Sequence, residues 1–177
     1  MDVDSYLKIG LWQEFGAVID YLERALTAYP EHLWTYSMWP TGDAPPERSQ
    51  VWYVAYHALF WLDLYLTGTE DGFLPPAPFL LIEQDEHGPI PERAYTQAEL
   101  LDYLRGCRQR CRATIQALTD ESAARQCSFS WGECSFYELQ IYSLRHVQEH
   151  TAQLNLVLGQ QGIPTADYPP QTRTPLA

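Results

Sequence analysis

The sequence predicts an all-α fold, a four-helix bundle, from the placement of its prolines and the periodicity of its apolar residues. All 13 prolines fall into three blocks, which span 30–46, 75–91 and 164 onwards. Because proline interrupts the interior of a helix, long helices are expected between these blocks. Apolar residues there recur every three or four positions, the spacing of one helix face. The 177 residues suffice for one sizeable core, so we expect a single domain over 1–177.

Two helices are predicted in the first half of the chain, from about Ser5 to Tyr29 and from about Ser49 to Thr67. The apolar stripe of the first helix consists of Leu7, Leu11, Phe15, Val18, Leu22 and Leu26. The second helix is apolar nearly all round, as expected for a helix that is buried on most sides. His57 lies at its centre, where an imidazole is costly unless its nitrogens find hydrogen bonds or a metal ion. The segment 30–48 is predicted to be a loop, and we assign no role to its His32.

Two capping boxes mark the starts of the third and fourth helices. Each box joins a Ser or Thr to a Glu three residues later, and the two boxes are Thr96 with Glu99 and Ser135 with Glu138. The third helix is predicted over about 96–118 and the fourth over about 135–161. Residues 119–133 between them are expected to contain no strand, and the tail after Pro164 is expected to be irregular.

A long connection, residues 68–95, joins the second and third helices and carries five of the prolines. A loop of this length is uncommon inside a compact domain, and is often functional or a crossover. Here it permits the second and third helices to run parallel, which a short turn would forbid. His87 lies in an acidic stretch of this connection, and we expect it to be a solvated loop residue.

Charge and composition narrow the class of protein. The net charge of −12 argues against nucleic-acid binding, because affinity for phosphates requires clustered Lys and Arg, and the sequence has no such cluster. The first residues are acidic rather than basic, and no apolar run approaches the length of a membrane span, so we expect a cytoplasmic protein. Six Trp, twelve Tyr and six Phe predict a core lined by aromatic rings. The four cysteines lack framework spacing and are expected to be reduced thiols.

Two of the five histidines, His146 and His150, lie four residues apart in the predicted fourth helix. This spacing places both imidazoles on the same side of an α-helix, and neutral imidazole is the commonest ligand for zinc, nickel or ferrous iron. His57 is the candidate third ligand, because the centres of the second and fourth helices can face each other in a bundle. Three nitrogens leave positions for water or substrate, which is typical of catalytic sites. A metal there would lower the pKa of bound water or thiol.

Other chemistries lack their motifs in this chain. There is no G-x-S-x-G elbow and no phosphate-binding glycine loop, and no histidine follows a glutamate by three residues, as di-iron bundles require. Residues 146–150 fit the peptidase pattern H-x-x-E-H, but the required acidic ligand downstream is missing, since only Asp167 follows. Cys107 and Cys111 share a helix face, where small apolar fillers are favoured over metal ligands. A bundle whose core histidines are satisfied without metal stays open as a further alternative.

The segment Arg145–Asn155 resembles the last helix of the DinB-like superfamily, the bacillithiol-transferase-like bundles, and Trp52–Trp61 resembles its second helix. The layout agrees with that family from the first helix to Gly162. The resemblance implies a four-helix bundle in up-down-down-up order, with a metal triad at His57, His146 and His150. It further implies zinc or nickel as the metal and a homodimer as the assembly. The characterised members transfer low-molecular-weight thiols or hydrolyse small molecules, often in detoxification.

The leading hypothesis is therefore a divalent-metal-dependent enzyme that acts on a small molecule, most plausibly by thiol S-transfer or hydrolysis. The alternative is a non-catalytic metal- or ligand-binding bundle. Gln153 either contacts the ligand and its surroundings or is an ordinary polar residue of a helix face. We expect Tyr53 in the core, and Glu149 either at the surface or among the residues that surround the ligands, because an ideal helix turns Glu149 about 100° away from the neighbouring histidines. Cys127 and Cys134 are expected to be structural.

Overall fold

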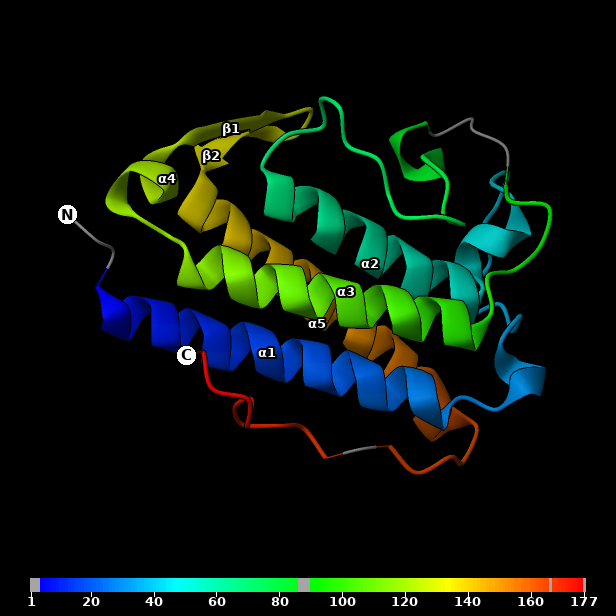
Figure 1. Cartoon of the computed structure of the whole chain (residues 1–177). Coiled ribbons are helices and arrows are strands. Elements are labelled where there is room, and N and C mark those ends of the chain that lie inside the picture. Colours follow the sequence, from blue (N-terminus) through cyan, green and yellow to red (C-terminus); the bar gives the residue numbers. More distant parts are fainter. Residues whose placement is uncertain (1–3, 86–89, 166, 177) are drawn as a thin grey trace.

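The computed structural model describes residues 4–85, 90–165 and 167–176, and its main body is a bundle of long helices (Figure 1). The four long helices are α1 (Ser5–Ala28), α2 (Val51–Thr67), α3 (Gln97–Gln116) and α5 (Phe136–Gln160). In Figure 1, α1 and α5 run in one direction and α2 and α3 in the other, which confirms the predicted up-down-down-up order. Both α1 and α2 pack against α3 and α5, so the order around the core is α1, α3, α2, α5.

Local signals explain where the helices begin and end, and each predicted end lies within two residues of the observed one. The capping box at Thr96 and Glu99 is present in both directions. At the start of α5 the Ser135 side chain accepts a hydrogen bond from the backbone N–H of Glu138 at 3.2 Å. Gly68 ends α2 in the left-handed conformation, with φ of 76°, which glycine adopts without steric cost.

One helix is buried almost completely, as the sequence predicted. All residues of α2 are buried except three, His57, Trp61 and Thr67. Thr67 is the last residue of the helix, whereas His57 and Trp61 lie one turn apart and form one opening in its middle. This opening faces the segment between α2 and α3. Among the described residues, none of the helices is long and apolar enough to cross a membrane.

A small hairpin precedes α5, so the prediction that residues 119–133 contain no strand was wrong. A short helix, α4 (Asp120–Ala124), leads into β1 (Gln126–Phe129), which pairs antiparallel with β2 (Gly132–Ser135). The residues of β1 alternate between exposed and buried, but four residues are too few for this pattern to stand out in a sequence. Gly132 has a φ of 143° next to the two-residue turn, a conformation that favours glycine. The hairpin places Trp131 at its tip.

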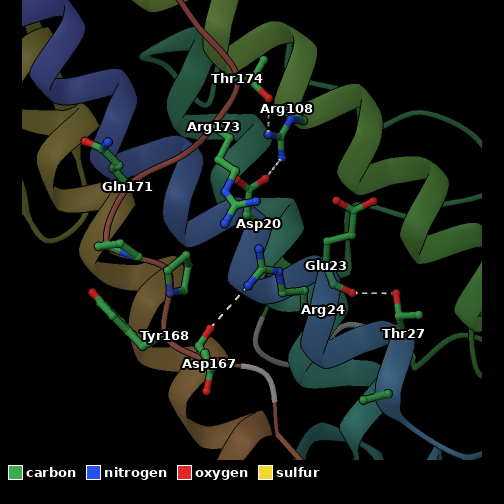
Figure 2. Close-up of a pocket in the computed structure, with 13 residues that line it drawn as sticks. Asp20, Glu23, Arg24, Thr27, Arg108, Asp167, Tyr168, Gln171, Arg173 and Thr174 are labelled. Carbon is green, nitrogen blue, oxygen red and sulfur yellow. Dashed lines mark hydrogen bonds and ion pairs between the residues drawn. The ribbon is translucent and has the colours of Figure 1, made fainter.

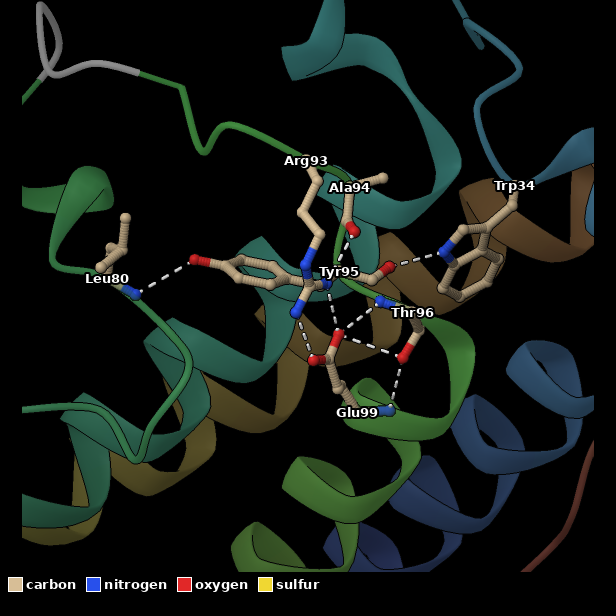
Figure 3. Close-up of polar contacts among 7 residues, drawn as sticks. All are labelled: Trp34, Leu80, Arg93, Ala94, Tyr95, Thr96 and Glu99. Carbon is tan, nitrogen blue, oxygen red and sulfur yellow. Dashed lines mark hydrogen bonds and ion pairs between the residues drawn. The ribbon is translucent and has the colours of Figure 1, made fainter.

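The crossover between α2 and α3 is held against the bundle by tyrosine hydroxyls. The hydroxyl of Tyr56 on α2 donates to the carbonyl oxygen of Leu80 at 2.5 Å. The N–H of Leu80 donates to the hydroxyl of Tyr95 at 3.1 Å (Figure 3). These bonds precede a single 3₁₀ turn, η3 (Ile82–Gln84), which carries Glu83 to α2. The segment 86–89, which includes His87, lies outside the described residues.

The tail after Pro164 is irregular, as predicted, and it lies along α1 (Figure 1), with hydrogen bonds to it from Arg108 and Arg112 of α3. The backbone N–H of Thr172 donates to the carbonyl oxygen of Gln13 at 3.0 Å. The indole N–H of Trp12 donates to the carbonyl oxygen of Thr174 at 2.7 Å. A Cβ atom on Gly16 would stand 2.6 Å from Cγ2 of Thr172, so this close approach requires glycine. A cavity of about 920 Å³ remains between the tail and α1 (Figure 2).

Candidate metal centre

Three histidines from two helices meet at the opening in α2. His57 projects from α2, and His146 and His150 project from consecutive turns of α5. The Nε2 atom of His146 lies 3.1 Å from Nε2 of His57 and 3.1 Å from Nε2 of His150. One ligand atom from each ring lies within 4.8 Å of the others. The structure thus brings together the three residues that the sequence predicted, while their role as metal ligands stays a prediction.

The protonated nitrogen of His57 is set by a carboxylate behind the ring. Oε2 of Glu83 lies 2.5 Å from Nδ1 of His57 and accepts a second hydrogen bond from the indole N–H of Trp61 at 3.1 Å. Burial opposes ionisation of Glu83, but the hydrogen bond and charge interaction with His57 outweigh it and lower the pKa of the carboxyl group. An ionised carboxylate only accepts hydrogen bonds, so Nδ1 of His57 carries a hydrogen, and Nε2 is the nitrogen left to face the other two rings.

The same arrangement recurs at His150 with an uncharged partner. The side-chain oxygen of Gln153 lies 2.8 Å from Nδ1 of His150, so this nitrogen also carries the hydrogen and leaves Nε2 bare. Of the two roles that the sequence left open for Gln153, contact with the surroundings of the site is the one observed. Nδ1 of His146 is buried, and no described residue offers it a hydrogen bond.

Burial keeps two of the rings neutral. Desolvation, reinforced by the neighbouring rings of His57 and His150, lowers the pKa of His146 to about 3. Desolvation, followed by the charge of His57, also lowers the pKa of His150. Both imidazoles are therefore uncharged at neutral pH, which is the form that binds metal ions.

The donor set fits a cation better than it fits a hydrogen-bond network. Acceptors behind the rings of His57 and His150 hold their Nδ1 atoms, so Nε2 of each ring faces Nε2 of His146 at 3.1 Å. In the neutral form that binds metal ions, the three rings then have at most one hydrogen, on His146, for these two contacts. A single positive ion satisfies all three nitrogens at once, and three histidines leave a tetrahedral ion one position for water or substrate.

Aromatic rings flank the histidines on the side of the hairpin. Trp131 at the hairpin tip is 44% exposed and stacks on Tyr142 of α5, with ring centroids 4.6 Å apart. Tyr65 contacts both of these rings edge-on and also meets the ring of His146, at a centroid distance of 6.4 Å. A cavity of about 120 Å³, lined by Tyr142, Arg145, His146 and Glu149, opens beside His146.

The other residues that the sequence singled out lie outside the cluster. Tyr53 is buried and Glu149 is exposed, both as expected. Cys127 and Cys134 are free, buried and directly opposite each other in the hairpin. Burial raises the pKa of both thiols. His32 belongs to a short 3₁₀ turn, η1 (Glu31–Leu33), and is exposed.

Sequence reasoning missed Glu83, the carboxylate that orients His57. It lies in a crossover without periodicity, 26 residues after its partner, and no motif places a loop carboxylate against a helix. The signal that the sequence did carry was indirect, because the buried His57 required a partner and the long crossover was free to supply one. Trp61 was equally hidden among the apolar residues of α2.

Comparison with known proteins agrees with this geometry. A search among curated proteins found no match for this chain. The family model of the DinB superfamily matches residues 12–154, a range that contains all three histidines. The match leaves the assignment of 1–177 to one domain as a prediction. Because the match covers most of the sequence and the four helices pack as the family bundle does, the chain belongs to the DinB superfamily.

Proposed function

We propose that His57, His146 and His150 hold a divalent metal ion, zinc or nickel, and that the protein is an enzyme acting on a small molecule. The proposed reactions are thiol S-transfer and hydrolysis in detoxification. The observation that carries the proposal is the convergence of three Nε2 atoms, two of which belong to rings whose Nδ1 atoms are held by acceptors behind them. A protein that merely buried three histidines would have no need to direct their Nε2 atoms to one point.

The residues around the centre have separable tasks in this proposal. A bound divalent ion would supply a Lewis acid that lowers the pKa of a bound thiol or water toward neutral. Glu83 and Gln153 hold the hydrogens of His57 and His150 at Nδ1, on the side away from the centre. Trp131 and Tyr142 offer stacked rings against which the apolar part of a substrate can pack, close to His146.

A non-catalytic metal- or ligand-binding bundle is the alternative, and one observation favours it. The cavity beside His146 has a volume of about 120 Å³, whereas small-molecule sites usually measure about 300–1,000 Å³. The enzyme proposal therefore requires either a small substrate or a substrate that stays partly exposed. We further propose a cytoplasmic homodimer that binds neither nucleic acid nor membrane; the net charge of −12 supports the exclusion of nucleic acid.

Metal content is the test of the proposed site. The untagged chain is purified without chelator, and its metals are measured by mass spectrometry for the native protein, His150→Ala and the control His32→Ala. His32 is exposed and outside the cluster, so its loss removes a histidine without touching the centre. We expect about one zinc or nickel per chain in the native protein and in His32→Ala, and a large loss in His150→Ala.

Activity separates the enzyme from the binding bundle. The native, metal-loaded protein is offered low-molecular-weight thiols with a panel of electrophiles, and small esters and amides for hydrolysis. Turnover that disappears both on removal of the metal and in His150→Ala supports the enzyme. A full metal complement without turnover across the panel would favour the non-catalytic bundle, and an absence of metal in the native chain would refute the enzyme and leave a binding bundle whose histidines serve packing.

A further inference from the structure

Glu83 is a buried carboxylate placed directly behind one of the three rings. Its side chain is 5% exposed, and a single oxygen, Oε2, binds both His57 and Trp61. Trp61 lies one turn after His57 on the same helix, so α2 itself presents two donors spaced to receive this oxygen. The carboxylate is therefore held by the helix and not only by its own loop.

The position of Glu83 relative to the ring decides what it can do. It contacts Nδ1 of His57, whereas the proposed metal-binding atom of that ring is Nε2. A carboxylate at this place cannot itself reach the centre, but it fixes the orientation of the imidazole and its hydrogen. Its negative charge also makes the opposite nitrogen a stronger donor to a cation.

The two other rings show that this support is specific to His57. His150 receives only the neutral oxygen of Gln153, and Nδ1 of His146 has no partner among the described residues. Among the described residues, a carboxylate is therefore hydrogen-bonded directly to one of the three rings only at His57, which comes from α2. The hydrogen bond between Tyr56 and Leu80 anchors the crossover that delivers this charge.

We propose that Glu83 is a positioning residue of the metal centre, which orients His57 from behind and tightens divalent metal binding through its charge. This inference rests on the metal-binding function proposed above. It also gives the crossover between α2 and α3 a second role. Besides connecting two parallel helices, the crossover places a negative charge beside the site.

Asp63 provides a matched control on the same helix. It is 5% exposed, and its carboxylate binds Arg110 of α3 at 2.7 Å and 2.8 Å and the hydroxyl of Tyr103 at 3.0 Å. Asp63→Asn therefore removes one buried negative charge from α2, as Glu83→Gln removes one from the crossover. The difference is that the partners of Asp63 lie on α3 and include none of the three histidines.

The test measures the dissociation constant of zinc at pH 7 for the full-length native chain, Glu83→Gln, Glu83→Ala and Asp63→Asn, by competition with a chromogenic chelator. Glu83→Gln keeps an oxygen that accepts from His57 but loses the charge, so we expect zinc binding to weaken about 10-fold. Glu83→Ala loses both, and we expect a loss of up to about 100-fold. Asp63→Asn should keep the native affinity.

Thermal unfolding of the metal-free proteins, followed by circular dichroism and compared with the zinc affinities, distinguishes positioning from a structural role. We expect metal-free Glu83→Gln and metal-free Asp63→Asn both to melt below the native temperature, because in each variant the donors lose a charged acceptor, but only Glu83→Gln should bind zinc more weakly. A lower melting temperature of Glu83→Gln together with native zinc affinity would overturn the inference and leave Glu83 as a structural residue. Failure of the native chain to bind zinc or nickel would instead overturn the proposed metal site and, with it, the inference.

Discussion

The two long sides of the bundle differ in how their polar atoms are satisfied. On the side of α1 and α3, Asp20 binds Arg108, which also donates to the Thr174 hydroxyl at 3.1 Å (Figure 2). Asp20 further accepts a hydrogen bond from the Thr172 hydroxyl at 2.8 Å. On the side of α2 and α5, three nitrogens face one another at 3.1 Å contacts, and Nδ1 of His146 has no partner among the described residues.

On the first side the chain satisfies its own polar atoms, whereas on the second side it leaves polar atoms that a bound ligand could satisfy. The tail supplies the partners on the first side, in the way that buried polar groups are normally satisfied. Leaving such groups without partners costs about 1–3 kcal/mol each, so folded proteins rarely gather them in one place unless a ligand completes them. A metal ion at the second side is therefore expected to raise the free energy of unfolding, and a substitution that displaces the tail from the first side is expected to lower it.

The largest expected effect is the stabilisation of the native chain by zinc. Because an ion that binds only the folded state adds to its stability, a free concentration of about 1,000 times the dissociation constant should raise the free energy of unfolding by about 4 kcal/mol. Urea unfolding with and without zinc measures this difference. His150→Ala should show little of it, whereas an equal gain in that variant would place the ion elsewhere and break the comparison between the two sides.

The fold of both sides was largely predictable because the relevant signals are local. The stripe of α1, the apolar run of α2 and the capping box at Thr96 each lie within one segment, and each needs no knowledge of distant residues. The hairpin at 126–135 was missed because each of its strands has only four residues, which is too short for alternation to be recognised. The path of the tail was missed too, since the contact between Thr172 and Gly16 joins distant segments.

The candidate centre was predictable only where it follows helix periodicity. His146 and His150 share a face through their spacing, and His57 was found because a buried imidazole requires a partner. Glu83 and the orientation of His57 that it sets depend on how an irregular crossover packs against α2, which no local pattern encodes. The parts that tune such a centre are thus harder to predict than the ligands themselves.

A smaller effect is expected from Gly16→Ala, which tests the side closed by the tail. The new Cβ would stand 2.6 Å from Thr172, so the tail must shift, and overpacking of this kind costs about 1–3 kcal/mol. Urea unfolding should show this loss, and limited proteolysis should cut the tail faster. The zinc-induced stabilisation should stay unchanged, because the site lies on the other side of the bundle.

Gly10→Ala is the matched control for that variant. Gly10 lies on the same helix, but a Cβ there meets nothing within 4 Å. Replacing a helical glycine with alanine in open space should stabilise the protein by up to about 1 kcal/mol. If both variants lost the same stability, the close contact with Thr172 would not be the cause, and the tail would not be closing this side as the structure indicates.

The smallest expected effect concerns the end of the crossover, where Glu99 accepts hydrogen bonds from Arg93 and from the Thr96 backbone (Figure 3). The hydrogen bond from Arg93, followed by that from Thr96, lowers the pKa of Glu99 to about 2 from its ordinary 4.5. The unfolded chain therefore takes up this proton first as the pH falls, so the stabilisation is complete above about pH 4.5 and is lost toward pH 2. Because Glu99 is partly exposed, we expect Glu99→Gln to cost only about 1 kcal/mol at pH 7.

This prediction is tested by urea unfolding of the native chain and of Glu99→Gln at pH 7 and near pH 2.5. The control, Glu92→Gln, removes an exposed charge from the same segment. The difference in the free energy of unfolding between the native chain and Glu99→Gln should be smaller at the lower pH, while Glu92→Gln should match the native chain at both pH values. Zinc affinity at pH 7 should be the same in all three proteins, because Tyr56 and Trp61 hold the Glu83 turn on α2 independently of the cap. A weakened zinc affinity in Glu99→Gln would mean that the crossover acts as one rigid piece, so that the two ends of this segment contribute to the centre together.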